Sequence, residues 1–328
     1  MKTFQVTRPT VFDMPPDMLL EEVKAKISDA GHRRHLSHGF DFDTRAHILE
    51  TEIGDDWEPH VKTMWETNKA NVRAGLIREY GELAIETKIE NFLAIGAKPM
   101  SVLSYHNAFY HQVRSAYVMG HYYPALVSAC ALGERILNHL VLDLREHYRT
   151  SPEYKNVYNK KSFDKWDIAL RALNDWKILL PEAAAAFEKL KVLRRYSVHF
   201  NVSTYTTLKE DALAAVLHMR EIINQQFGTW GLRPWLIRGT KGQIFIAKDW
   251  ETHPFIATYF LPRAPFVGPL FGMAHDDARW NFYDVPDYGD GGLTDAQFAA
   301  AYNDRSPDDI VSEPFEIEYV GDDGSSTG

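Results

Sequence analysis

Hydrophobic residues recur at helical spacing along most of the first 228 positions. The segment 15–30 is typical of these, because Leu19, Leu20, Val23 and Ile27 fall on one face of a helix. Most of this part of the chain is therefore expected to be helical. The predicted helices cover 15–30, 56–95 as one or two helices, 100–148 as a long helix or a pair broken at 121–124, 162–179, 182–201 and 207–227.

Punctuating residues mark several of the expected helix ends. Pro181 is expected to open the helix at 182–201, because proline at the first turn loses no hydrogen bond. Thr207 and Glu210 have capping-box spacing, which predicts a helix start there. Gly228 is expected to end that helix as a left-handed cap.

The pattern changes near residue 229. Segments 242–248 and 255–261 are rich in β-branched and aromatic residues and are expected to be strands, as is 315–319, while 294–302 is expected to be a short helix. The fold class predicted is mainly α, with a β-containing C-terminal part. The expected domains are a helical N-terminal region at 1–99, a helical bundle at 100–228, an acidic α+β domain at 229–320 and a disordered tail at 321–328.

Composition indicates a folded, soluble protein of 328 residues, because 45% hydrophobic and 13% aromatic residues can supply a core. The single cysteine, Cys130, lies in an apolar run and is expected to be a buried structural thiol. No apolar run approaches a membrane span, and the N-terminal residues do not have the pattern of a signal peptide. We therefore expect a cytoplasmic protein without membrane contact.

The net charge of −9 is unevenly distributed. From Asp276 onward there are 14 acidic and 2 basic residues, whereas 186–238 holds eight Lys/Arg and four Asp/Glu. The purely structural interpretation of 186–238 is a solvated helix face. The functional interpretation is a positive field that attracts phosphates. The acidic C-terminus is expected to restrain access to that field.

The segment 190–201 carries the most informative chemistry, because it places Arg194 five residues before His199 at the end of an expected helix. An arginine stabilises charge on phosphate oxygens, and a histidine moves a proton near neutral pH. These two groups suffice for RNA cleavage without a metal ion. On a regular helix the two side chains lie about 140° apart. A competent site therefore needs either a distorted helix end or residues of two chains, and we expect the second.

Two motifs, Gly120–Asn138 and Leu193–Asn201, together resemble the HEPN family of helical-bundle proteins. The resemblance covers about 100–228 and implies a homodimeric, metal-independent endoribonuclease with Arg194 and His199 as catalytic residues. It implies RNA as substrate, a 2′,3′-cyclic phosphate product and no cofactor. Proteins of this kind often serve as stress or antiphage effectors, so a regulatory protein or a small-molecule trigger is also expected.

Further residues near the motif are candidates for support or RNA binding: Arg195, Tyr196, Asn201, Glu134 and Asn138. Glu134 and Asn138 are one turn apart and would either orient the catalytic residues or hold two helices together. Arg195 stands where the family prefers Asn, Asp or His. This departure favours the alternative hypothesis, a non-catalytic HEPN-like module that binds a nucleotide or a protein partner.

A metal enzyme is a third hypothesis, because 32–43 contains several residue types that bind metals: His32, His35, His38, Asp41 and Asp43. Arg33 and Arg34 would oppose a cation, and the spacing is not a zinc pattern. We therefore predict a solvated loop without a metal ion. The aromatic residues of 229–285 are expected mainly in a β core.

Overall fold

A computed structural model describes residues 4–6, 31–37, 41–102, 104–198, 204–276, 279–285 and 287–311. Of the described residues, 60% are helical and 9% are in strands, which confirms the mainly α prediction. The chain forms two compact units: unit 2 is continuous, 38–233, and unit 1 combines 1–37 with 234–328. These boundaries differ from the expected 99/100 and 228/229, and they group the N-terminal segment with the C-terminal one. The helix expected at 15–30 and the strand expected at 315–319 lie outside the described residues.

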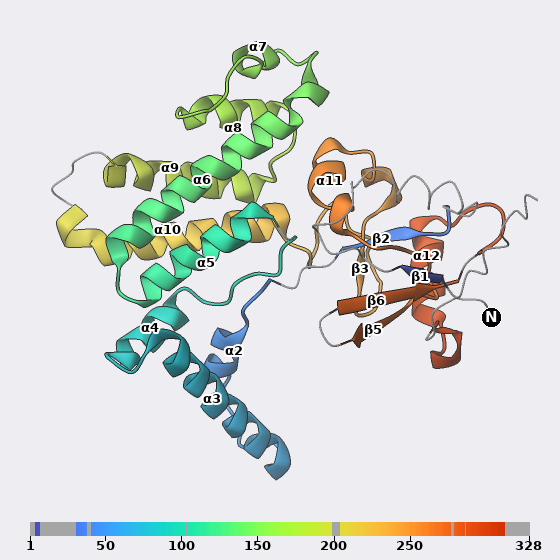
Figure 1. Ribbon diagram of the computed structural model, residues 1–328, viewed down its shortest axis with the longest axis horizontal. Helices are drawn as coiled ribbons and strands as arrows, with labels where there is room; N and C mark the ends of the chain where they lie inside the picture. The colour runs from blue at the N-terminus through green and yellow to red at the C-terminus, as the bar shows by residue number, and fades with distance from the viewer. Residues whose placement is uncertain are drawn as a thin grey trace, which may run out of the picture. The chain divides into compact units, whose positions relative to one another are not determined.

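Unit 2 is helical (Figure 1). Its central helix, α6, packs against α5, α8, α9 and α10, because its apolar residues form a wide buried face. The expected break at 121–124 is confirmed: Gly120 takes a left-handed conformation between α5 and α6. The helices are α2 Arg45–Glu50, α3 Pro59–Tyr80, α4 Ile85–Ala94, α5 Tyr105–Val118, α6 Tyr122–Leu144, η1 Arg145–Tyr148, α7 Tyr154–Val157, α8 Trp166–Asp175, α9 Pro181–Val198 and α10 Thr204–Phe227.

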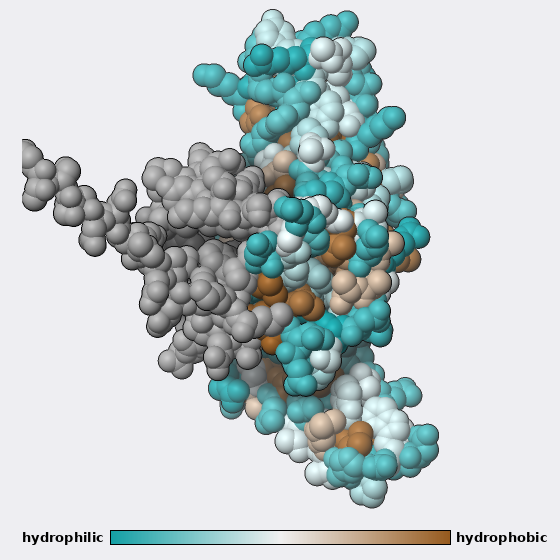
Figure 2. Space-filling model, turned by 90° about the vertical axis from the view of Figure 1, so that its right-hand side faces the viewer, coloured by the Kyte–Doolittle hydropathy of each residue, from teal (hydrophilic) through white to brown (hydrophobic). Residues whose placement is uncertain are grey.

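By length and composition, one helical stretch of the described chain, Tyr122–Tyr148, passes a test for a membrane span. More than half of its apolar window is buried inside the unit, as expected of the core helix of a soluble bundle. Figure 2 shows one face of the molecule, on which hydrophilic residues predominate and apolar residues form small groups.

Two predicted helix ends are wrong in detail. Helix α10 begins at Thr204, so Thr207 lies inside it and its hydroxyl donates to Asp211 Oδ2 at 2.7 Å instead of capping the helix. Gly228 does follow the last helical residue, but it is not among the residues with positive φ. It is glycine because a Cβ atom there would lie 2.2 Å from the Asn224 carbonyl oxygen.

In its described residues, unit 1 forms two three-stranded antiparallel sheets, in the orders β1-β6-β5 and β3-β2-β4. Each sheet pairs a strand from the beginning of the chain with strands from its end. The elements are β1 Phe4–Val6, β2 Arg34–Ser37, β3 Ile244–Phe245, η2 Lys248–Trp250, α11 Pro254–Tyr259, η3 Leu261–Arg263, β4 Phe266–Val267, β5 Gly272–Asp276, β6 Arg279–Asp284, α12 Asp295–Asp304 and η4 Pro307–Asp309.

The predicted strand at 255–261 is wrong, because these residues form α11 and η3. Pro254 occupies the first turn of α11, where it costs no hydrogen bond. Phe255, Ile256, Tyr259 and Phe260 are buried at helical spacing. The predicted helix at 294–302 is confirmed by α12, which begins with a capping box between Thr294 and Gln297.

The core of unit 1 is aromatic, as expected. Phe245 contacts Phe298 and Tyr302, with ring centroids 4.8 and 5.1 Å apart, and so joins β3 to α12. Phe271 and Phe282 complete the same buried cluster. Most aromatic residues of this region thus serve packing rather than ligand binding.

The solvated loop predicted around Arg33 and Arg34 is wrong, because both side chains are 1% exposed. Arg33 forms a buried ion pair with Asp284 and donates to the Val285 carbonyl at 2.7 Å. Arg34 Nε lies 2.7 Å from Asp295 Oδ1. The free-energy cost of burying these guanidinium groups is offset by carboxylates that follow some 250 positions later in the sequence.

Candidate functional site

Arg194 lies on α9 and is held by residues of α6 and α8. Its Nη2 atom is 2.6 Å from Glu134 Oε2, and its guanidinium carbon is 5.7 Å from the ring centroid of Trp166. Trp166 Nε1 in turn donates to the same Glu134 oxygen at 3.3 Å. Arg194 and Glu134 remain 27% and 32% exposed, so the guanidinium is fixed in position at the surface of the unit.

This arrangement separates the two roles considered for Glu134 and Asn138. Glu134 contacts Arg194 directly and so orients it. Asn138 accepts a hydrogen bond from the Phe163 amide at 2.6 Å and donates to the Phe163 and Glu134 carbonyls. Asn138 therefore holds the chain that enters α8, which is a structural role.

The other predicted residues are not brought to Arg194 by any described contact. Arg195 and Tyr196 are exposed on α9, and Tyr196 is 47% exposed. His199 and Asn201 lie outside the described residues. The described part of the site is thus a positioned arginine beside an exposed basic and aromatic helix surface.

Cys130 lies on α6 beneath this region and is fully buried, which confirms the prediction of a structural thiol. Burial raises the pKa of the thiol to about 11, and this outweighs the opposing effects of Ser197 and Arg194. Ser197 Oγ lies 3.8 Å from the sulfur. A thiol with that pKa is protonated at neutral pH, so Cys130 is not a nucleophile.

The positive field along α9 is weaker than its composition indicates. Lys191 forms ion pairs with Asp167 and Glu188 at 2.7 and 2.5 Å. Lys189 is exposed and lies close enough to His218 to reinforce the lowering of its pKa, of which burial is the larger cause. The positive charge on this face that is not paired with a described carboxylate therefore comes mainly from Lys189 and Arg195.

His38 lies outside the described residues, and the other residues proposed for a metal site are divided between the two units. His35 is buried in unit 1, where its Nδ1 atom lies 3.1 Å from Glu251 Oε1. Asp41 and Asp43 belong to unit 2. In the described ranges, no three His, Cys, Asp or Glu residues gather as metal ligands would.

Sequence reasoning missed Trp166, whose ring supports Arg194 and whose N–H orients Glu134. Trp166 lies in the helix predicted at 162–179 and is buried, but a buried tryptophan carries no further signal in sequence. Only the packing of α8 against α6 and α9 reveals its contact with the arginine.

No family model, curated protein or solved structure matches this chain.

Proposed function

We propose that unit 2 is a HEPN-like, metal-independent endoribonuclease that acts as a homodimer. The observation that carries the proposal is the orientation of Arg194 by Glu134 and Trp166, because a fixed guanidinium is what phosphate recognition requires. The segment that follows α9 contains His199, which would supply the proton-transferring group.

In the proposed reaction, the RNA 2′-hydroxyl attacks the adjacent phosphorus atom and His199 accepts the hydroxyl proton. Arg194 stabilises the negative charge that builds up on the phosphate oxygens. The bond to the 5′-oxygen of the next nucleotide breaks, and that oxygen takes a proton. The products are a 2′,3′-cyclic phosphate and a 5′-hydroxyl.

We predict that Arg194→Ala and His199→Ala each reduce RNA cleavage by about 100-fold or more and leave the protein folded. Arg149→Ala is a matched control, because Arg149 also pairs with a glutamate, Glu146, at 2.7 Å on the surface of unit 2. Cleavage of a labelled RNA should persist in EDTA. Wild-type rates from purified His199→Ala protein would overturn the proposal.

Assembly is tested with the same variants. Light scattering should give about twice the chain mass of 37.6 kDa. If each active centre takes Arg194 from one protomer and His199 from the other, mixing the two inactive variants should restore part of the activity. A monomer that cleaves RNA would refute the shared site while leaving the residue assignment intact.

A second candidate function is a non-catalytic module that binds a nucleotide or a protein partner. The ion pair with Glu134 favours it, because this pair already satisfies much of the charge on Arg194. In that case the wild type would bind RNA or a nucleotide without cleaving RNA. Arg194→Ala would then lower the affinity for RNA or the nucleotide, and neither protein would cleave RNA.

A further inference from the structure

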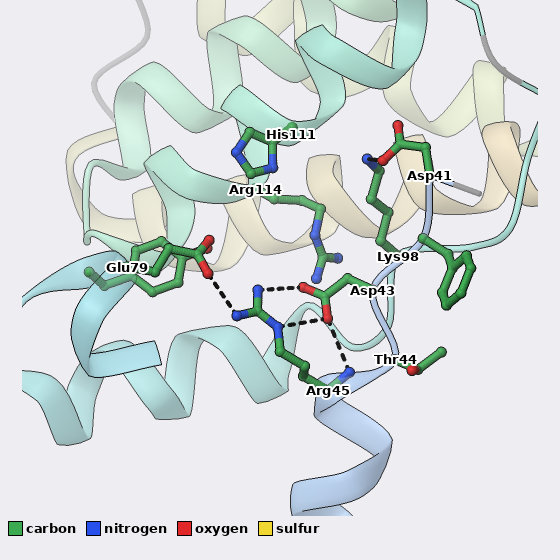
Figure 3. Close-up of a pocket in the computed structure, with 10 residues that line it drawn as sticks. Asp41, Asp43, Thr44, Arg45, Glu79, Lys98, His111 and Arg114 are labelled. Carbon is green, nitrogen blue, oxygen red and sulfur yellow. Dashed lines mark hydrogen bonds and ion pairs between the residues drawn. The ribbon is translucent and has the colours of Figure 1, made fainter. Parts of the chain in front are cut away.

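A cavity of about 480 Å³ lies in unit 2, and neither Arg194 nor the residues that hold it are among its lining residues, which are mostly charged. Figure 3 shows these lining residues. The walls of the cavity come from the segment 41–45 that leads into α2, the end of α3, Lys98 and one side of α5. Small-ligand sites commonly measure about 300–1,000 Å³. This cavity is therefore large enough for a compact metabolite.

The charges around the cavity balance, and two of its three cations are already neutralised. Arg45 donates to both oxygens of Asp43, at 3.0 and 2.8 Å, and to Glu79 Oε2 at 2.7 Å. Lys98 forms an ion pair with Asp41. Burial alone would raise the pKa of Asp43, but the hydrogen bonds from Arg45 and the charges of Arg45 and Arg114 lower it, so Asp43 remains ionised at neutral pH.

Arg114 is the third cation and is differently placed. It is 4% exposed, and its Nη2 atom donates to the Gly96 carbonyl at 2.8 Å. Its Nη1 atom is buried and has no hydrogen-bond partner among the described residues. Figure 3 shows the guanidinium extending from α5 toward Asp43. A buried donor without a partner is costly, so this atom marks where a ligand acceptor would be stabilising.

The guanidinium is also held in place before any ligand arrives. Its central carbon lies 5.9 Å from the ring centroids of both Phe92 and Tyr110, which are fully buried. A guanidinium that is fixed and presents an unfilled N–H matches the planar oxygens of a carboxylate. Preorganisation of this kind lowers the cost of binding.

We propose that this cavity binds a small zwitterion of the amino-acid class, with its carboxylate on Arg114. The three acidic residues Asp41, Asp43 and Glu79 balance the three cations, which disfavours a doubly charged phosphate. Their oxygens have lone pairs beyond those used by Arg45, and an ammonium group can donate to them. Phe42, which is 39% exposed, supplies an apolar wall for the ligand side chain.

The test measures binding rather than RNA cleavage, so its outcome is independent of the proposed nuclease site. Full-length protein is titrated with the standard amino acids, the corresponding amines that lack the carboxylate, inorganic phosphate and adenosine monophosphate. We expect at least one amino acid to raise the melting temperature by about 3–6 °C at ten times its Kd. The matching amine should give no shift, because it cannot bind Arg114.

Variants locate the site. Arg114→Lys keeps the charge but loses the planar fork and should weaken binding by about tenfold or more. Arg73→Lys is the matched control, because Arg73 is an exposed arginine paired with Glu86 and does not line the cavity. If Arg114→Lys does not fold, His111→Trp serves instead, since exposed His111 lines the cavity and a larger ring would obstruct it.

The proposal is overturned if no amino acid shifts the melting temperature at about 5 mM, a concentration that would reveal millimolar affinity. It is also overturned if phosphate or adenosine monophosphate binds and the amino acids do not. Equal binding by the wild type and by folded Arg114→Lys or His111→Trp protein would refute the location.

Discussion

Cys130 illustrates how burial controls the chemistry of a single residue. Its pKa of about 11 means that the thiolate is rare at pH 8. We predict that an aromatic disulfide reagent modifies native protein at least about 100-fold more slowly than protein unfolded in guanidinium, as followed by absorbance. Equal rates in the two states would contradict the burial of this thiol.

The same pKa determines how Cys130 affects stability at alkaline pH. Because the folded pKa lies above that of the unfolded thiol, the fold favours the protonated form. The stability that the fold gains by keeping this thiol protonated is fully present below about pH 8.5, and it is lost as the pH rises through 11. Replacement by Ala or Ser should reduce that alkaline loss.

Residue roles were predictable from sequence only where neighbours in sequence determine them. Cys130 was correctly identified as buried because its own run is apolar. Arg33 and Arg34 were misjudged, because their partners Asp284 and Asp295 lie at the other end of the chain. Arg194 was singled out by its motif, but its contact with Trp166 depends on how three helices pack.

Gly133 shows what close packing demands of one helix. A Cβ atom on Gly133 would lie 2.7 Å from Leu190 Cδ2 and from the rigid ring of Trp166. Overpacking costs about 1–3 kcal/mol, whereas replacing glycine in a helix gains about 0.5–1 kcal/mol. Gly133→Ala should therefore lower the free energy of unfolding by about 1–2 kcal/mol in urea denaturation.

Gly75→Ala is the matched control on α3, where the nearest atom to an added Cβ is 4.0 Å away. This exchange should stabilise the protein by about 0.5–1 kcal/mol. If Gly133→Ala instead raised the free energy of unfolding, α6, α8 and α9 would be able to move apart without a cost in stability.

Helices were predicted well where periodicity was long and end signals were local. Pro181 opens α9 as expected, and Thr294 caps α12. The prediction of a strand at 255–261 is wrong because a short apolar run fits a strand or a buried helix equally well. Pro254, at the first turn of α11, was the available signal for a helix.

The division of the whole chain into units predicts which fragments fold. Fragment 38–233 contains all of unit 2, so it should give a helical circular dichroism spectrum and a cooperative melt. Fragment 234–328 should remain unfolded, because its sheets lack β1 and β2. Joining 1–37 to 234–328 by a flexible linker should restore folding. Native-like NMR dispersion from 234–328 alone would refute the division.

The unit boundaries could not be predicted from local composition. The change of pattern near 229 is real and lies within a few residues of the observed 233/234 boundary. The return of 1–37 to unit 1 depends on the pairing of β1 with β6 and of β2 with β3 and β4. Pairing between strands so far apart leaves no trace in a window of sequence.

The discontinuity of unit 1 also sets an order of events during synthesis. Strand β2 leaves the ribosome early, but its partner strands and the carboxylates of Asp284 and Asp295 emerge only after the entire helical unit. Until then the β2 segment has no partner strands and can pair with other chains. Charged residues oppose such pairing. Arg34 in β2 and Arg33 beside it are charges of this kind, and we expect them to oppose such pairing until Asp284 and Asp295 join them in the interior.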